Sequence, residues 1–106
     1  VPNHGNPVGH AMSEADKREL AALLDESGTP LVEDDVYGDF GHDNPRPRTL
    51  QSLLRRSEWF LVGSASKSVS AGLRLGWLVA PAARRRELDY LQYTQTTGAS
   101  TLDQYA

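Results

Sequence analysis

The chain has 106 residues, of which 39% are hydrophobic and 24% are charged, and its formal net charge is −3. This length suffices for one small domain, and the acidic balance gives no electrostatic reason to bind nucleic acid. No apolar run has membrane-spanning length, no signal-peptide pattern is visible, and the lack of cysteine excludes disulfides and thiolate metal sites while fitting a reducing cytoplasm.

The first predicted element is a helix that follows a turn-rich opening at residues 1–9. Ser13 is a candidate N-cap for a helix that runs to about residue 26, and Glu14 and Asp16 lie in its first turn. Gly28 lies just beyond its end, where helices commonly stop. The apolar spacing of a half-buried helix is given by Leu20, Ala21, Leu23 and Leu24.

A short buried strand is predicted at residues 29–32, and it ends in the three acids Glu33, Asp34 and Asp35. Residues 38–48 hold Gly, Pro, Asn, Asp and Arg without periodicity, which predicts a loop. A short helix is predicted next, from the spacing of Leu50, Leu53 and Leu54.

The second half of the chain continues the alternation of strands and helices. Residues 59–62 are a second buried strand, which runs into a Ser/Gly loop that ends at Lys67. Residues 73–80 are a third predicted strand, and Pro81 opens a helix over residues 82–96. The turn-rich start and the unfinished helix start at residues 100–103 indicate that residues 1–106 are the central part of a larger domain, cut at both ends.

This alternation predicts an α/β layered fold with a mostly parallel sheet. Ligands of such folds bind at the carboxyl ends of the strands. Because the acidic cluster and the Ser-Lys loop each follow a strand directly, both are expected to face one crevice.

The Ser-Lys loop offers Ser64, Ser66 and Lys67, with Arg74 seven residues after the lysine. Hydroxyls, backbone N–H groups and a guanidinium can cradle a phosphate. The lysine would be either a point charge on that phosphate or an amine that forms an imine. A P-loop is a poor match because Ser66, rather than glycine, precedes the lysine. On position alone, a solvated surface lysine is the simpler interpretation.

The acidic cluster is typical of a solvated strand end or of a helix start. A divalent metal site with His4, His10 and His42 is the alternative, although none of the three has the spacing of a metal motif. An aspartate that faces a ring nitrogen would instead keep a pyridine protonated. Tyr37 lies three residues after Asp34.

The order of these motifs is more specific than any one of them. Asn-Pro-x-Gly at residues 6–9, by itself a common turn, is followed by Asp-x-x-Tyr at 34–37, Ser-x-Ser-Lys at 64–67 and then an arginine. In this order the chain resembles the fold-type I PLP-dependent aminotransferase superfamily over nearly its whole length. Val8 stands where that family usually has threonine.

The resemblance implies a partial large domain of the PLP-dependent transferase fold, with a mixed, mainly parallel sheet flanked by helices, and pyridoxal 5′-phosphate (PLP) as cofactor. It implies that Lys67 carries the cofactor as a Schiff base and that Asp34 pairs with the pyridine nitrogen. Asn6 and Tyr37 would bond the phenolic oxygen. The phosphate would be held by Ser64, Ser66 and Arg74.

Residues 32–40 and 72–77 most resemble the aminotransferase-like domain of MocR-type regulators in the GntR family. That resemblance implies a homodimer with an amino acid or amine as effector, and DNA contact only through an upstream winged helix-turn-helix domain. Stand-alone aminotransferases of the aminoadipate and kynurenine kind share the same sequence motifs, so a fragment of such an enzyme is the alternative to a regulator. A phosphate- or metal-binding α/β domain without aldehyde chemistry is the third interpretation. Residues 1–106 alone are expected to bind PLP weakly and to be inactive, since they lack the family's upstream phosphate-binding turn and its substrate-binding small domain.

Overall fold

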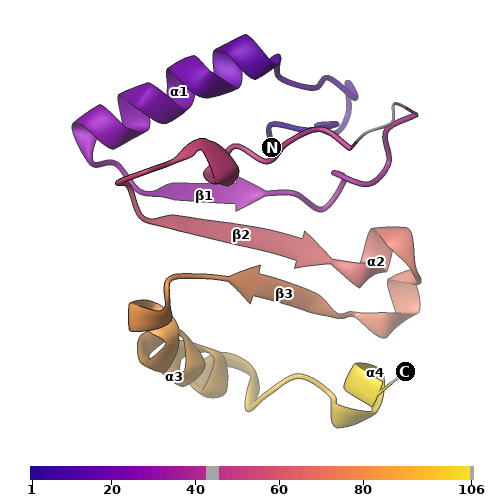
Figure 1. Cartoon of the computed structure of the whole chain (residues 1–106). Helices are drawn as coiled ribbons and strands as arrows, with labels where there is room; N and C mark the ends of the chain where they lie inside the picture. Colours follow the sequence, from indigo (N-terminus) through magenta and orange to yellow (C-terminus); the bar gives the residue numbers. More distant parts are fainter. Residues whose placement is uncertain (43–45, 106) are drawn as a thin grey trace.

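The computed structural model describes residues 1–42 and 46–105. Its elements alternate along the chain as helices and strands (Figure 1). The strands are β1 (Leu31–Asp34), β2 (Trp59–Ser64) and β3 (Gly76–Val79), and the α-helices are α1 (Glu14–Ser27), α2 (Ala65–Ser68), α3 (Arg85–Thr96) and α4 (Thr101–Tyr105). Short 3-10 helices are η1 (Gln51–Leu53), η2 (Ala71–Leu73) and η3 (Ala82–Arg84).

The three strands form one mixed sheet in the order β1-β2-β3. β1 and β2 are parallel, with Asp34 opposite Val62, and β2 and β3 are antiparallel, with Ser64 opposite Gly76. Helix α1 lies beyond β1 and helix α3 beyond β3 (Figure 1). The predicted fold class, a mixed α/β sheet flanked by helices, is confirmed.

Helix α1 forms where its capping residues predict it. The hydroxyl oxygen of Ser13 accepts a hydrogen bond from the backbone N–H of Asp16 (3.1 Å), which satisfies one of the free donors of the first turn. Gly28 ends the helix at φ 68°, and its N–H donates to the carbonyl of Leu24. The inner face buries Ala21 and, unexpectedly, Lys17.

The first and third strands differ from their predicted bounds. β1 begins at Leu31, whose N–H donates to the carbonyl of Glu58, because Pro30 has no N–H to pair. It then runs on through two of the acids, and Val32 is 68% exposed rather than buried. β3 begins only at Gly76, because Arg74 takes up a left-handed conformation with φ 50° that breaks an extended strand.

The other elements follow the sequence pattern closely. The second strand is confirmed and extends to Ser64, and the short leucine helix is the 3-10 turn η1. The predicted helix at 82–96 is η3 followed directly by α3. Residues 43–45 of the predicted loop lie outside the described residues. Within the described ranges, no helix combines the length and the hydropathy that a membrane crossing requires.

Candidate functional site

The predicted site residues gather at one edge of the sheet. β1 and β2 run in parallel, so Asp34 and Ser64 stand at neighbouring strand ends. β3 runs the opposite way and starts opposite Ser64, which brings the preceding Arg74 to the same edge. In Figure 1 this edge carries α2, in which Lys67 lies. The acidic cluster and the Ser-Lys loop therefore lie at the same edge of the sheet.

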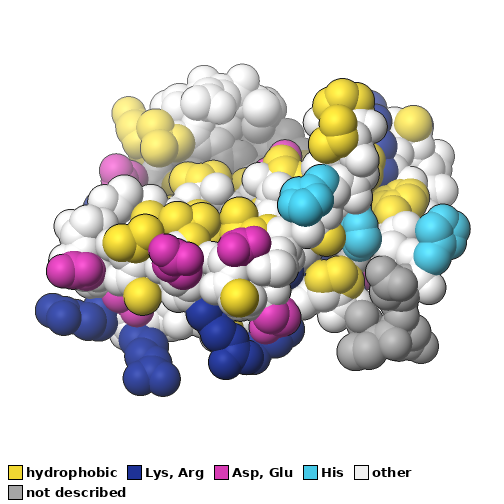
Figure 2. Space-filling model, turned by 90° about the horizontal axis from the view of Figure 1, so that it is seen from above, with side chains coloured by type: hydrophobic (Ala, Val, Ile, Leu, Met, Phe, Trp, Pro, Cys, Tyr) yellow, Lys and Arg dark blue, Asp and Glu magenta, His cyan; other side chains and the backbone are white. Residues whose placement is uncertain are grey.

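Asn6 lies on a loop closed by a bridge between Gly5 and His10. His4 and His10 line an open hollow together with Tyr37 and Phe40, so this loop adjoins the turn after β1. The histidines gather at one end of the molecule (Figure 2). The Asn6 side chain itself is exposed.

The three consecutive acids have three different environments. Glu33 is 1% exposed, and its two carboxylate oxygens accept the backbone N–H groups of Leu50 (2.9 Å) and Gln51 (2.7 Å). Asp35 is 8% exposed and is bound by the guanidinium of Arg46.

Asp34 is the exposed acid of the three. One of its oxygens accepts the N–H of Val36 (3.1 Å), and the structure describes no other hydrogen bond to its carboxylate within residues 1–42 and 46–105. Strand alternation points it to the opposite face of the sheet from Glu33. Of the cluster, Asp34 is thus the acid whose carboxylate is available to a ligand.

Tyr37 is held by the turn that follows β1. The N–H of Asp35 donates to Val62 (3.0 Å), and the carbonyl of Asp35 accepts the N–H of Gly38 (3.2 Å). The Tyr37 ring is half-buried and packs edge-on against Phe40, with ring centroids 5.9 Å apart. Its position therefore depends on the backbone around Asp35.

The Ser-Lys loop is organised by Ser64. Its hydroxyl accepts the N–H of Ser66 (3.1 Å) and donates its one proton to the carbonyl of Leu75 (3.2 Å). A phosphate would have to displace Leu75 to receive a hydrogen bond from Ser64. Lys67 follows in α2 with an exposed side chain, for which the described residues provide no hydrogen-bond partner.

Arg74 is also exposed, in the turn between η2 and β3 rather than in the predicted strand. The N–H of Gly72 in this turn is capped by the hydroxyl of Ser70 (3.3 Å). The arginine is consequently at the right edge of the sheet, and its guanidinium is accessible to an anion.

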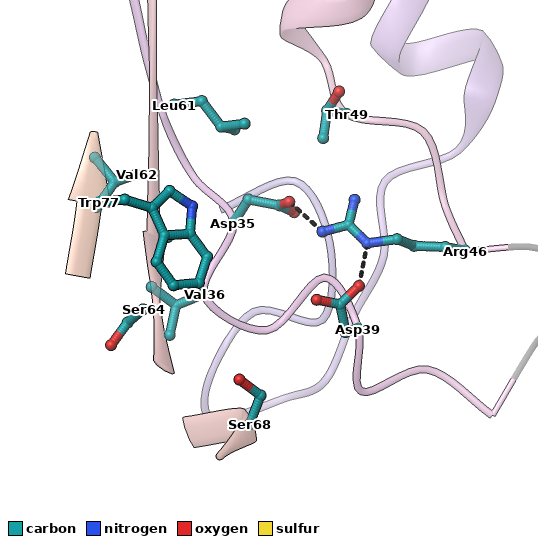
Figure 3. Close-up of a pocket in the computed structure, with 11 residues that line it drawn as sticks. Asp35, Val36, Asp39, Arg46, Thr49, Leu61, Val62, Ser64, Ser68 and Trp77 are labelled. Carbon is teal, nitrogen blue, oxygen red and sulfur yellow. Dashed lines mark hydrogen bonds and ion pairs between the residues drawn. The ribbon is translucent and has the colours of Figure 1, made fainter. Parts of the chain in front are cut away.

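A small hollow of about 140 Å³ lies beside this edge (Figure 3). Arg46 points into it and binds both Asp35 and Asp39. Burial on its own lowers the pKa of Arg46, but the hydrogen bonds to the two carboxylates outweigh it and raise that pKa above its ordinary value. Of the predicted site residues only Ser64 lines this hollow, whereas Asp34, Lys67 and Arg74 lie on the exposed part of the edge.

Sequence reasoning missed two buried polar residues next to this site, Lys17 and Asn3. Lys17 is 1% exposed, and its ammonium donates to the side-chain oxygen of Asn3 and to the carbonyl of Arg48 (both 2.7 Å). A usable signal was present: Lys17 occupies a position of the apolar stripe that continues at Ala21 and Leu24. A lysine at such a position is expected to have internal partners.

The chain matches the family "Aminotransferase class I and II" over residues 1–106. It is 34% identical over its whole length to the uncharacterized HTH-type transcriptional regulator YisV of Bacillus subtilis, of which it covers 22%. It is 41% identical over 93 residues to the uncharacterized HTH-type transcriptional regulator YjiR of Escherichia coli, which is 88% of this chain and 20% of the relative. The chain thus spans about a fifth of the length of these relatives.

Among solved structures, the kynurenine aminotransferase of Pyrococcus horikoshii superposes on 98% of this chain with a TM-score of 0.90 at 26% identity, over 26% of its own length. The α-aminoadipate aminotransferase LysN of Thermus thermophilus superposes on 98% of this chain, and 28% of its own, with a TM-score of 0.84 at 26% identity. Sequence and fold agree over the whole chain, which therefore belongs to the aminotransferase class I and II family.

Proposed function

We propose that this chain is the cofactor-binding part of an aminotransferase-like effector domain in a MocR-type transcriptional regulator, with PLP as its cofactor. The observation that carries the proposal is the sheet edge at which the available carboxylate of Asp34 and the exposed amine of Lys67 follow two parallel strands. The regulator part is supported by the relatives that are named HTH-type transcriptional regulators. The cofactor is supported by structural relatives solved with PMP or with a phosphopyridoxyl amino acid.

The residues at this edge fit the chemical groups of PLP. The carboxylate of Asp34 has the charge to pair with a protonated pyridine nitrogen. The hydroxyl of Tyr37 and the amide of Asn6 are suitable donors for a phenolic oxygen. The phosphate would take the guanidinium of Arg74 and the hydroxyl of Ser66, and also the hydroxyl of Ser64 in place of its hydrogen bond to the Leu75 carbonyl.

Bound PLP supplies an aldehyde that combines with amines and a ring that withdraws electrons. Lys67 would hold the cofactor covalently through its ε-nitrogen and yield that place to the amino group of an incoming amino acid or amine. The freed lysine amine would then accept and return the proton of the substrate α-carbon. Asp34 would keep the ring nitrogen protonated throughout.

In a regulator, the replacement of Lys67 by an incoming amino acid or amine would serve to detect that molecule. An amino acid or amine that occupies the site in place of Lys67 favours one conformation of the domain over another. This conformational preference changes the affinity for DNA only if a linked DNA-binding domain is coupled to it. DNA would therefore be contacted by another part of the longer protein. We place the protein in the cytoplasm, as a homodimer.

The decisive experiment labels the lysine. The full-length protein is incubated with PLP, reduced with borohydride and digested, and the pyridoxyl peptide is identified by mass spectrometry. We expect the adduct on Lys67 and its loss in Lys67→Ala, whereas the buried Lys17 stays unmodified. A folded protein that gains no adduct anywhere would instead favour a phosphate- or metal-binding domain without aldehyde chemistry.

A stand-alone aminotransferase is the second candidate, because the superposed structures include kynurenine and α-aminoadipate aminotransferases. Two measurements on the full-length protein separate the candidates. A regulator binds DNA with an affinity that changes when PLP and an amine are both present. An aminotransferase that is supplied with a second oxo acid as amino acceptor converts an amino acid to its oxo acid over many turnovers, and its chain has no DNA-dependent response.

A further inference from the structure

A series of hydrogen bonds between buried polar side chains begins at Lys17 on the inner face of α1. Neither acceptor of its ammonium, the Asn3 side-chain oxygen and the Arg48 carbonyl, carries a formal charge. A buried ammonium with only neutral acceptors keeps much of its desolvation cost. Through one of these acceptors the ammonium is connected to a charged group further along the contacts.

That group is Asp35, which is reached through Asn3. The fully buried Asn3 amide donates to the Asp35 carboxylate (3.4 Å) and to the carbonyl of Arg48 (3.3 Å). Arg46 binds the other oxygen of the same carboxylate (Figure 3). Asp35 is thus held from two sides, and the contacts join α1, the opening loop, the segment before η1 and the end of β1.

The anchored aspartate lies between Asp34 and Tyr37, the two residues that the proposed function places on the cofactor ring. Its backbone N–H is bonded to Val62 and its carbonyl to Gly38, so the Asp35 side chain and the turn move together. A displacement of this side chain would carry Asp34 and Tyr37 with it. The contacts among Lys17, Asn3 and Asp35 therefore influence where Asp34 and Tyr37 lie relative to the cofactor ring.

The lysine at position 17 buries a charge where the pattern of the helix predicts an apolar side chain. Position 17 continues the apolar stripe of Ala21 and Leu24, where methionine or leucine would pack without the cost of burying a charge. An apolar side chain there would bury no charge, but it would leave the Asn3 side-chain oxygen and the Arg48 carbonyl without this donor. What an apolar side chain cannot do is hold the Asn3 amide in the orientation that donates to Asp35.

We infer that Lys17 and Asn3 are positioning residues for PLP, which act through Asp35 to set the turn that bears Asp34 and Tyr37, an inference that rests on the proposed function. Removing this support is expected to weaken PLP binding by about tenfold, the size of a typical coupling between contacting residues. The absorption bands of the bound cofactor are expected to change in ratio, because they report the polar contacts of its ring.

The test uses the full-length protein and three variants. Lys17→Met keeps the length of the side chain and removes the charge. Asn3→Asp keeps an acceptor for Lys17 but replaces the donor to Asp35 with a repelling carboxylate. Arg18→Met is the matched control, since Arg18 is an exposed neighbour on α1 that pairs only with Glu14 in the described chain (3.8 Å). PLP affinity, the band ratio and thermal unfolding of the cofactor-free protein are measured for each.

Support requires Lys17→Met and Asn3→Asp to weaken PLP binding and change the band ratio, with Arg18→Met within about twofold of the wild type. Should Lys17→Met fail to fold, Asn3→Asp decides, because it retains the contact with Lys17. Wild-type affinity and spectrum in a folded Asn3→Asp protein would overturn the role of the network alone. A wild-type protein that takes up no PLP would overturn the proposed function as well.

Discussion

At the scale of single residues, the three consecutive acids at 33–35 have different structural roles because their partners lie far away in sequence. Glu33 organises the start of η1, Asp35 anchors the turn after β1, and Asp34 keeps an exposed carboxylate. The carboxylates are chemically alike, so the difference comes from the side of the strand and from residues that the fold brings near. Substitutions in this cluster should therefore separate binding from stability.

In the full-length protein, Asp34→Asn is expected to weaken PLP binding without loss of stability, whereas Asp35→Asn is expected to destabilise the fold. Asp34→Asn removes an exposed charge and should change the free energy of unfolding by less than about 0.5 kcal/mol, while PLP binding weakens. Asp35→Asn weakens charge-assisted hydrogen bonds of a buried carboxylate and should lower the free energy of unfolding by about 1.5–3 kcal/mol. Denaturant unfolding of the cofactor-free protein and PLP titration measure the two quantities. Equal loss of stability in both variants would contradict this assignment.

Asp25 is a second carboxylate with a structural task. It accepts the backbone N–H groups of Arg55, Arg56 and Ser57, each at 2.9 Å. The hydrogen bonds from Ser57 and Arg56 are the main reasons that the pKa of Asp25 is lower than its ordinary value of 3.8. Because these bonds favour the charged form, they connect the end of α1 to the start of β2 most firmly when Asp25 is ionised.

The stabilisation from Asp25 should be lost in acid. A carboxyl group whose pKa is lower in the folded state stabilises the fold above its unfolded pKa, near 3.8, and loses that effect as the pH falls through the folded pKa. Asp25→Asn should therefore lower the melting temperature at neutral pH and show a smaller further decrease in acid. Melting temperatures between neutral pH and about pH 3 would check this. Parallel curves for variant and wild type would contradict it.

The family resemblance predicts Asp34 as the cofactor's acid because it lies three residues before Tyr37, and this role stays a prediction. The sequence could not show that Asp35 forms an ion pair, because its partner Arg46 belongs to a loop without periodicity. Lys17 was missed for a related reason: helix rules treat an isolated lysine as a solvated residue. Only the folded positions of Asn3 and Arg48 show why it is buried.

At the scale of elements, ends set by local bonds were predictable and ends set by sheet pairing were not. Ser13 and Gly28 fix α1 through hydrogen bonds within a few residues, so its bounds were found to within one residue. The start of β3 depends instead on the left-handed turn at Arg74, which no residue type in 73–80 demands. The start of β1 depends on the carbonyl of Glu58, the residue before β2, which lies much later in the chain.

The pairing of β2 with β3 predicts a close packing requirement at Gly63. A Cβ atom at this position would overlap the indole of Trp77 on the adjacent strand. Gly63→Ala should displace that indole, destabilise the protein by about 1–3 kcal/mol and shift the tryptophan fluorescence. Gly72→Ala is the control, because its Cβ would meet only the Ser70 hydroxyl at 3.6 Å. Unchanged fluorescence and stability in Gly63→Ala would show that the packing is looser than described.

At the scale of the whole molecule, the chain is open rather than closely packed. Its radius of gyration is 15.3 Å, against about 13 Å for a compact domain of about 100 residues. The buried hydrophobic core of its described part consists of Ala21 and Leu50. Large apolar side chains are exposed on the sheet and on α3, among them Val32, Trp77, Leu78, Val79, Tyr90 and Tyr93.

Such exposure predicts how residues 1–106 behave in isolation. Exposed apolar area of this kind favours self-association, and a small core leaves little stability to offset chain entropy. The isolated chain should elute as a mixture of oligomers, bind a hydrophobic dye, and unfold with low cooperativity. The full-length protein, which should cover the same side chains, is the control for each measurement.

PLP binding by the isolated chain should be weak for the same reason. The edge that bears Asp34, Lys67 and Arg74 is exposed, so water competes for every contact the cofactor would make. A cofactor site gains most of its affinity from residues held still by a surrounding core, and here that core is thin. Spectroscopic titration should therefore show PLP affinity well below that of the full-length protein, with no oxo acid formed from amino acids. Sustained turnover by residues 1–106 would contradict this view, since it would mean that one edge of a three-stranded sheet suffices to orient cofactor and substrate.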